Sequence, residues 1–406
     1  MAMAKRIRLS PAVTGIAESK TVAIFAQVTD MKSRGEKVNG ALCVGQPDFA
    51  PPAEALKATE EAANKGLTSY TGVAGTLELR QAICEYLKDN KKTTYKPEEV
   101  LVTCGGKQAI YSVIMALCQK GDEVIVPAPY WTSYPDIVKL AGAAPVILET
   151  TADQGYAIDP EAVAAAINPS TNMLVVCNPS NPTGCSMTRG QLEALAEVLR
   201  RPENEHVWVL SDEIYEMISY DTEHVSFAAL DGMWERTLTI NGFSKAFAMT
   251  GYRLGYLAAP APIVKAAMKL VSQMTSCAAS VAQYAGIAAL KSDMSYIKGK
   301  IEELQSKRDQ AMALMLEIPD VVCPKPGGAF YLLPDISAYF GKKSNSGEEI
   351  TDANKFCMHL LQDYKVALVP GSAFGAPKCI RLSYAATVED IQDAVSKLAE
   401  CLKALR

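Results

Sequence analysis

Long hydrophobic runs, histidines and excess positive charge are all scarce in this sequence of 406 residues. Nowhere do 18 or more apolar residues follow one another, which excludes an ordinary transmembrane helix. Lys and Arg total 40 against 45 Asp and Glu, so we expect no broad basic surface for nucleic acid or a membrane. The only histidines are His206, His224 and His359. None lies in a motif that supports a histidine-based triad. Small molecules are therefore the expected partners.

The 11 cysteines are scattered, and no two form a C-x-x-C pair. We therefore expect no zinc site and no other metal. A chain of this size does not need disulfides to hold its core, so free thiols in a reducing compartment are expected. The first ten residues carry Lys5, Arg6 and Arg8 but lack the apolar stretch of a secretory signal. We expect an intracellular, cytoplasmic protein, or one in a plastid or other organelle if a transit peptide was removed.

Hydrophobic residues make up 49% of the sequence, enough for a large core. In its middle part, short β-branched runs alternate with longer helical patterns, which predicts a mostly parallel sheet covered by helices on both faces. The predicted strands are 100–104, 123–126, 145–149, 173–177, 207–210, 237–241 and 254–258. The predicted helices that alternate with them are 108–119, 134–141, 160–167, 188–201 and 262–274.

The two ends of the chain differ from this middle part. Amphipathic helices are predicted at 21–35 and 52–66, each ended by a glycine. The last hundred residues predict a smaller α+β unit with helices at 296–317 and 387–405 and strands at 329–333, 366–369 and 380–384. We therefore predict three parts: an N-terminal arm that also joins a small domain (1–48), a large domain (49–295), and the C-terminal small domain (296–406).

A lysine in an apolar segment is the first candidate for chemistry. Lys245 lies between Phe243 and Phe247 in N-G-F-S-K-A-F-A-M-T-G-Y-R and has no acidic neighbour in sequence. Burial disfavours its ammonium form, and a desolvated amine is what an imine-forming nucleophile needs. Arg253, in the same segment, suits a fixed phosphate partner. The alternative is two solvated cations on a surface loop, which is the commoner case for an isolated lysine.

Further polar groups follow the predicted strands, where ligands of parallel sheets bind. Asp212 and Tyr215 come after the fifth strand, with a helix N-cap and a core aromatic as their structural alternatives. After the fourth strand, two prolines in N-P-S-N-P-T-G hold the Asn181 amide in one direction. The G-G-K sequence at 105–107 opens a helix and predicts an anion site, although it lacks the spacing of a Walker A loop.

In combination, the segments S-D-E-I-Y-E, N-G-F-S-K-A-F-A-M-T-G and N-P-S-N-P-T-G are highly specific. They resemble those of class I aminotransferases of fold type I, which depend on pyridoxal 5′-phosphate (PLP), and most of all the prokaryote-type and plastid-type aspartate/prephenate branch. The resemblance extends from Thr21 to Leu405. It implies a three-layer α/β/α fold with a mostly parallel seven-stranded sheet, the large domain binding PLP. It also implies transamination between amino acids and 2-oxo acids, here aspartate and 2-oxoglutarate, by a ping-pong mechanism.

The resemblance also implies a role for each candidate residue. Lys245 would hold PLP as an internal aldimine and shuttle a proton, and Asp212 would keep the pyridine nitrogen protonated. Asn181 and Tyr215 would donate to the phenolic oxygen of the ring. The other cofactor contacts would be Gly105, Gly106, Lys107, Ser244 and Arg253 around the phosphate, Trp131 stacked on the ring, and Tyr70 reaching the neighbouring subunit of a homodimer with shared active sites. The substrate would meet Gly45, Trp131, Asn181, Lys107, Thr21 and Arg381, the last gripping its α-carboxylate.

One segment departs from the family pattern. The branch has a basic residue followed by proline near the N-terminus, where this sequence has Ala17 and Glu18. Losing one charge-assisted contact to a dicarboxylate costs about 1.5–3 kcal/mol. Thr21 and Lys107 remain candidates for that contact, with Lys20 placed to compensate. The departure argues most against prephenate as substrate.

Three alternatives stay open at this point. Ala17 motivates an aminotransferase with broader or different donor use, such as aromatic or neutral amino acids, prephenate or arogenate. A PLP-dependent lyase or decarboxylase on the same fold differs in which bond of the substrate is broken, which the motifs constrain poorly. An effector-binding module of a regulator would need an added basic helix-turn-helix domain, and we set it aside.

Overall fold

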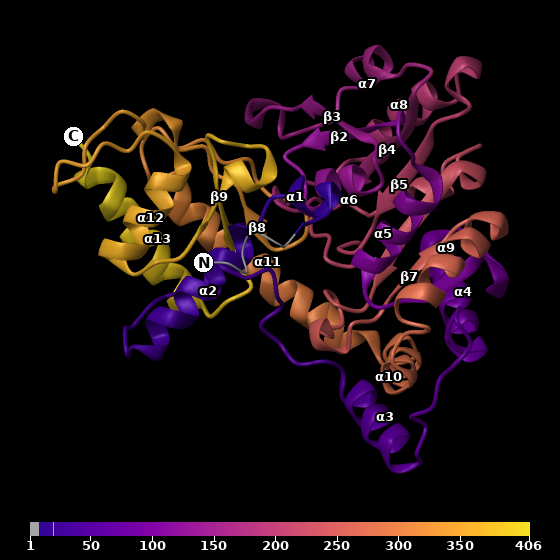
Figure 1. Cartoon of the computed structure of the whole chain (residues 1–406). Helices are drawn as coiled ribbons and strands as arrows, with labels where there is room; N and C mark the ends of the chain where they lie inside the picture. Colours follow the sequence, from indigo (N-terminus) through magenta and orange to yellow (C-terminus); the bar gives the residue numbers. More distant parts are fainter. Residues whose placement is uncertain (1–7, 19) are drawn as a thin grey trace.

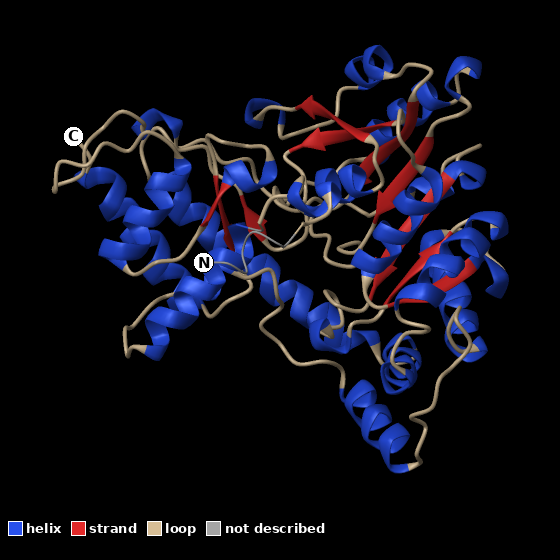
Figure 2. Cartoon of the chain, in the orientation of Figure 1, coloured by secondary structure: helices blue, strands red, loops and turns tan. Residues whose placement is uncertain are grey.

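The structure is a computed structural model that describes residues 8–18 and 20–406. Its larger sheet has seven strands in the order β1-β7-β6-β5-β4-β2-β3, seen in red in Figure 2. Only β7 runs antiparallel to its neighbours. The strands are β1 (Val100–Thr103), β2 (Glu123–Ala128), β3 (Ala144–Glu149), β4 (Thr171–Cys177), β5 (Trp208–Asp212), β6 (Thr237–Gly242) and β7 (Gly255–Ala258). All seven predicted strands are present, and the predicted α/β fold is confirmed.

Helices cover both faces of this sheet, as Figure 1 shows. Alternate residues of a strand face opposite layers: Val124 and Val126 lie in the core that contains α5 and α9 residues, whereas Ile125 packs with α8. The helices of one face are α5 (Gly106–Leu117), α6 (Ser133–Leu140) and α9 (Ala261–Met274). Those of the other face are α4 (Leu77–Lys91), α7 (Pro160–Ala166), α8 (Arg189–Leu199) and α10 (Ser280–Leu290). The predicted three-layer architecture is confirmed.

Two helices of the second face, α4 and α10, were not anticipated from the sequence. The α10 segment S-V-A-Q-Y-A-G-I-A-A-L has no clear polar face, because the helix is enclosed by α4 and by α3 (Ala53–Asn64). Helix α4 begins at a Thr76 cap, whose Oγ1 accepts from Leu79 N at 3.3 Å. Both helices pack near the site described below, and α4 supplies two of its supporting side chains.

A second sheet, of three antiparallel strands in the order β8-β10-β9, lies beside the first (Figure 2). Its strands are β8 (Tyr331–Leu332), β9 (Val369–Pro370) and β10 (Ile380–Ser383). Its helices are α2 (Lys20–Ser33), α12 (Ala353–Tyr364), α13 (Val388–Ala404) and the long α11 (Met294–Leu316). The four-residue α1 (Pro11–Thr14) contacts α6 instead. The predicted strand 366–369 is wrong for its first three residues, because Val366 bridges Asn39 instead.

Both chain ends meet at this smaller sheet. Asn39 N donates to Lys365 O at 2.8 Å, and Ala367 N donates to Asn39 O at 3.0 Å. Figure 1 shows the indigo helix α2 beside the yellow helices α12 and α13. These contacts agree with a small unit assembled from both ends, while the boundaries at 48/49 and 295/296 stay predictions.

Several composition-based expectations concern the whole chain. No described helix is long and apolar enough to cross a membrane. All 11 cysteines are free thiols. Within residues 8–18 and 20–406, no group of three or more His, Cys, Asp or Glu side chains is placed to hold a metal. The basic residues Lys5 and Arg6 lie outside the described residues.

Candidate active site

A cavity of about 310 Å³ opens where the carboxyl ends of β4, β5 and β6 meet. The loops after these strands, and the one before α5, bring together side chains that are far apart in the sequence. Ten of the predicted site residues line the cavity: Gly45, Gly106, Lys107, Trp131, Asn181, Asp212, Tyr215, Ser244, Lys245 and Arg253. The expectation that strand-end motifs share one site agrees with this geometry.

Lys245 reaches into the cavity from the turn after β6. Its Nζ donates to Gly45 O at 2.6 Å and lies 5.6 Å from the centroid of the Tyr215 ring. Burial, followed by the cations Arg381 and Arg253, lowers the pKa of Lys245, Asp212 opposes them, and the net value is about 8. A substantial fraction of the amine is therefore neutral near physiological pH, as a nucleophile or general base requires.

Asp212 is the last residue of β5 and is buried beside the cavity. Tyr134 Oη donates to its Oδ2 at 2.5 Å, and Ile214 N donates to its Oδ1 at 3.3 Å. Burial raises the pKa of Asp212, whereas Tyr134, Ile214 N and Lys245 lower it. A buried carboxylate of this kind is stabilised by a cationic partner in the cavity. Sequence reasoning missed Tyr134, although it lies in the same P-Y-W-T-S-Y segment as Trp131.

Arg381 comes from β10 of the smaller sheet and is buried next to the cavity. Its Nη1 donates to Asn181 Oδ1 at 3.1 Å and its Nη2 donates to Cys43 O at 3.2 Å. Its Nε is buried without a hydrogen-bond partner among the described residues, and burial lowers the pKa of Arg381. A buried guanidinium with no carboxylate beside it is poorly compensated, which fits a site for a carboxylate of the substrate.

The start of α5 has features that suit an anion-binding site. Gly105 has φ +78°, and a Cβ there would lie 2.5 Å from Arg253 Nη2, so only glycine admits the arginine so closely. The free N–H groups of a helix start favour an anion, and Arg253 adds a fixed positive charge. Lys107 Nζ lies 4.8 Å from the centroid of the Trp131 ring. Burial lowers the pKa of Lys107, and Arg253 lowers it further.

Four predicted contacts do not line the cavity: Gly105 and Arg381, which contact residues that do, and Tyr70 and Thr21. Tyr70 is 87% exposed and does not line it. Thr21 lies in the first turn of α2 and does not line it either. Lys20, placed to compensate for Ala17, donates instead to Asn354 Oδ1 at 3.0 Å and to Ser372 Oγ at 2.8 Å. The roles of Tyr70 and Thr21 stay predictions.

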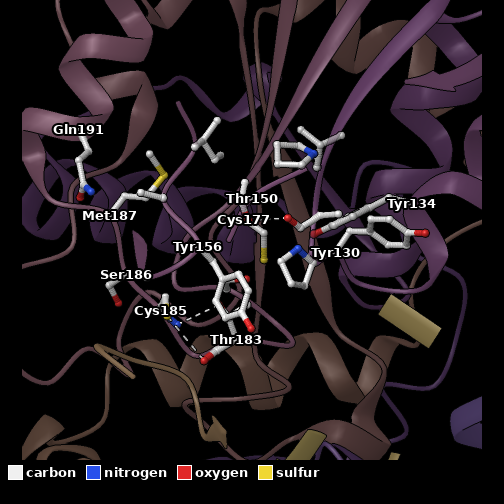
Figure 3. A pocket seen from close by; sticks show the side chains of 18 residues that line it. Tyr130, Tyr134, Thr150, Tyr156, Cys177, Thr183, Cys185, Ser186, Met187 and Gln191 are labelled. Atoms are coloured by element: carbon white, nitrogen blue, oxygen red, sulfur yellow. Dashed lines mark hydrogen bonds between the residues drawn. The ribbon is translucent and has the colours of Figure 1, made fainter. Parts of the chain in front are cut away.

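A smaller cavity of about 60 Å³ lies behind Tyr134 and Cys177, which line both cavities (Figure 3). It has room for about two water molecules. Figure 3 shows Tyr156, Thr183 and Cys185 gathered on one side of it. Apart from Tyr134 and Cys177, its lining contains no residue of the larger cavity, so a cofactor-sized molecule belongs in the larger one.

Comparison with known proteins decides the family. A model described as aminotransferase class I and II matches residues 40–398. The chain belongs to this family. It is 43% identical, over 98% of this chain and 84% of the relative, to a bifunctional aspartate aminotransferase and glutamate/aspartate-prephenate aminotransferase of Petunia hybrida. It is 41% identical, over 96% of this chain and 97% of the relative, to an aspartate/prephenate aminotransferase of Cereibacter sphaeroides.

Solved structures agree with this assignment. The aspartate aminotransferase from Rhizobium meliloti has a TM-score of 0.94 and 37% identity, covering 98% of this chain and 100% of that chain. The aspartate aminotransferase from Thermus thermophilus with maleate has a TM-score of 0.90 and 36% identity, covering 97% and 100%. The fold-type I architecture and the PLP-dependent aminotransferase activity implied by the motifs are confirmed.

The residues in and next to the larger cavity fit PLP. Lys245 supplies a desolvated amine, Asp212 a buried carboxylate that favours a cationic ring nitrogen, and Gly105 a cradle open to Arg253. Each of these features matches one part of the cofactor: its aldehyde, its pyridine ring and its phosphate.

Two buried carboxylates, Glu213 and Glu216, anchor the segment 211–216 on the side away from the cavity. Glu213 Oε1 accepts from Ser211 Oγ at 2.9 Å, from Ser226 Oγ at 2.8 Å and from Phe227 N at 3.2 Å. Glu216 accepts from Tyr86 Oη and pairs with Lys91, both on α4. Asp212 and Tyr215 thus face the cavity while Glu213 and Glu216 tie the same segment to the fold behind it. Sequence reasoning missed the contacts of Glu216 because α4 was not anticipated.

Lys91→Met should lower the free energy of unfolding of the cofactor-free protein by about 3–5 kcal/mol. The substitution leaves the Glu216 carboxylate buried without its cation, since both side chains are at most 9% exposed. Urea unfolding followed by circular dichroism measures the change. Lys88→Met, at an exposed position of the same helix, is the control and should shift stability by less than about 0.5 kcal/mol. Equal losses of unfolding free energy in the two variants would show that the Lys91–Glu216 ion pair does not stabilise the fold.

Proposed function

We propose that this aminotransferase transfers the amino group of aspartate to 2-oxoglutarate by a ping-pong mechanism. The observation that carries the proposal is the pair of cations at the cavity: the buried Arg381 for the α-carboxylate and Lys107 for the second carboxylate. Aspartate and 2-oxoglutarate are both dicarboxylic, so one pair of cations serves both half-reactions. Relatives from Pinus pinaster and Bacillus subtilis, 43% and 38% identical, are named aspartate aminotransferase.

The proposed roles follow from the position of each side chain. Lys245 would bind PLP covalently and, when displaced, carry the proton, for which its lowered pKa suits it. Asp212 would pair with the ring nitrogen, while Asn181 and Tyr215 would donate to the ring oxygen. The phosphate would be held by Gly105, Gly106, Ser244 and Arg253, with Trp131 stacked on the ring. Bound PLP supplies an electron sink for the carbanion character that develops at the substrate Cα.

Half-reactions without an acceptor test the substrate proposal. The visible absorption of the PLP-loaded enzyme should change on mixing with aspartate or glutamate. The second-order rate constant of this change should be higher than for alanine, methionine and phenylalanine. A response to the neutral or aromatic donors alone would contradict the proposed specificity while leaving the aminotransferase assignment intact. Release of pyruvate and ammonia without any keto-acid acceptor would favour the lyase alternative. Strict dependence on an acceptor excludes it.

Lys107→Met should lower kcat/KM for aspartate by about 10- to 150-fold, the value of one charge-assisted contact. With alanine as donor, which has no second carboxylate, the same substitution should have little effect. Steady-state kinetics on both donors measures the difference, and Lys120→Met, at an exposed position beyond α5, is the control. An equal loss of kcat/KM with alanine would contradict a role of Lys107 in binding the second carboxylate. It would favour the other predicted role, contact with the cofactor.

We infer further that the enzyme is an intracellular homodimer whose active sites are shared. Tyr70 supports this, because a large aromatic that is 87% exposed in its own chain is free to reach the PLP phosphate of a second copy. Free thiols at all 11 cysteines suit a reducing, cytoplasmic setting. Sedimentation equilibrium should give twice the mass of one chain. A fully active monomer would contradict the shared site.

A further inference from the structure

Tyr331, in β8, belongs to none of the sequence motifs, yet it contacts three parts of the site. The residue is completely buried, and the cavity lining does not include it. It therefore stands behind the residues that face substrate and cofactor. Its three neighbours there are Tyr215, Arg381 and Gly45.

The first contact joins two hydroxyl groups. Tyr331 Oη and Tyr215 Oη lie 2.7 Å apart, and the two rings meet edge to face with centroids 5.8 Å apart. A phenol has one hydrogen to donate and can also accept. If Tyr215 donates its hydrogen into the cavity, Tyr331 is the group placed to donate to Tyr215. Hydrogen bonds in such a chain polarise and strengthen one another.

The second contact seats the carboxylate-binding cation. The guanidinium carbon of Arg381 lies 4.7 Å from the centroid of the Tyr331 ring and 4.8 Å from that of Phe374. Strand pairing explains the approach, because Tyr331 lies opposite Ser383 and Arg381 is two residues away on the same face of β10. Contact with aromatic rings holds the planar guanidinium in one orientation.

The third contact is with Gly45, whose carbonyl oxygen binds the Lys245 amine. A Cβ at Gly45 would lie 2.5 Å from Tyr331 Oη, so the tyrosine hydroxyl occupies the space that any other residue at position 45 would need. The carbonyl oxygen of Gly45 in turn accepts from Lys245 Nζ at 2.6 Å. One side chain of the smaller sheet thus lies against both the cofactor end and the substrate end of the site.

We propose that Tyr331 is a positioning residue with two separable parts: its hydroxyl aims the Tyr215 hydroxyl at the cofactor ring oxygen, and its ring orients Arg381 for the substrate carboxylate. The first part rests on the proposed role of Tyr215. The second rests only on the contact with Arg381. Each part therefore has its own measurement.

The hydroxyl is tested by Tyr331→Phe, which keeps the ring. A Tyr215 hydroxyl that donates to the ring oxygen stabilises the charged form of that oxygen, so weakening the donor should raise the midpoint of the pH titration of the bound cofactor's visible absorption. We expect a rise of about 0.5–1 pH unit for Tyr331→Phe, and a rise at least as large for Tyr215→Phe. In the Tyr215→Phe background, Tyr331→Phe should add nothing, because its hydroxyl acts through Tyr215.

The ring is tested by Tyr331→Leu against Tyr331→Phe. Succinate, an unreactive dicarboxylate, is titrated into the PLP-loaded enzyme and followed by the same absorption band. Its Kd should rise about 3- to 30-fold in Tyr331→Leu, which loses the aromatic contact to Arg381, and should be unchanged in Tyr331→Phe. Equal Kd values in the wild type and both variants would overturn the second part of the proposal.

Tyr384→Phe is the matched control. Tyr384 is also completely buried just after β10, and its hydroxyl lies 3.4 Å from Tyr220 Oη and donates to Ala329 O at 3.2 Å, but it does not line the cavity. Loss of the Tyr384 hydroxyl should leave the midpoint of the pH titration unchanged. A shift equal to that of Tyr331→Phe would overturn the part of the proposal that concerns the Tyr331 hydroxyl. So would a shift in Tyr215→Phe without one in Tyr331→Phe, or shifts that add in the double variant. No shift in either single variant would instead overturn the role of Tyr215.

Discussion

Lys245→Ala should reduce transamination by about four orders of magnitude or more, because it removes both the covalent attachment point and the proton carrier. Lys245 is the one lysine whose Nζ lies beside Asp212, Tyr215 and Arg381 in the larger cavity of the described chain. Arg253 and Asp212, the proposed partners of the phosphate and of the ring nitrogen, remain in the variant. We therefore expect PLP still to bind, without the absorption band of the covalent form.

Stopped-flow mixing with aspartate and absorption spectra of the loaded protein check this result. Lys265→Ala, at an exposed position of α9, is the control and should keep wild-type kinetics. The wild-type apoprotein adds a pH test: uptake of PLP should accelerate as pH rises through about 8, where the Lys245 amine becomes neutral. Persistence of both the covalent band and transamination in Lys245→Ala would overturn the assignment of the whole site.

Arg381→Lys should lower kcat/KM for every amino-acid donor by about 30- to 5,000-fold, the cost of disrupting a buried, hydrogen-bonded charge contact. Lysine cannot form the paired bonds of the guanidinium or lie flat between Tyr331 and Phe374. At least one of the two acceptors, Asn181 Oδ1 and Cys43 O, would also lose the hydrogen bond that Arg381 donates to it. The loss should therefore extend beyond charge to geometry.

Donor dependence separates this residue from Lys107. Every amino acid has an α-carboxylate, so Arg381→Lys should affect alanine and aspartate alike, whereas Lys107→Met should affect aspartate alone. Arg34→Lys, on the exposed surface after α2, is the matched control for the arginine-to-lysine change. Alanine kinetics that are unchanged in Arg381→Lys would place the α-carboxylate elsewhere.

The motif loops were predictable because each depends on local sequence. Asp212 ends one buried strand and Lys245 follows another, and the β-branched runs of both strands are recognisable from their periodicity and composition. Parallel strands bring their carboxyl ends to one edge, so motifs at successive strand ends were expected to converge, and the cavity contains them. Lys245 between two phenylalanines was likewise expected to be desolvated, and its pKa of about 8 agrees.

The supporting contacts were not predictable in the same way. Tyr134, Lys91 and Tyr331 lie on elements whose roles depend on tertiary neighbours: Tyr331 and Tyr215 are 116 residues apart in sequence. Helix α4, which carries Lys91, was missed altogether. Near the N-terminus, Lys20 was expected to compensate for Ala17. In the structure its amine instead donates to Asn354 and Ser372, which are distant in sequence.

The sequence by itself determined the seven strands, the family and most of the candidate side chains that line the larger cavity, because hydrophobic period and strand-end motifs are properties of contiguous residues. Only the tertiary structure decided what stands behind those side chains. Strand pairing in the smaller sheet places Tyr331 against Arg381, and the packing of α4 places Lys91 against Glu216. The physical reason is that burial, hydrogen-bond partners and charge pairing arise from the approach of distant segments, which no local pattern encodes.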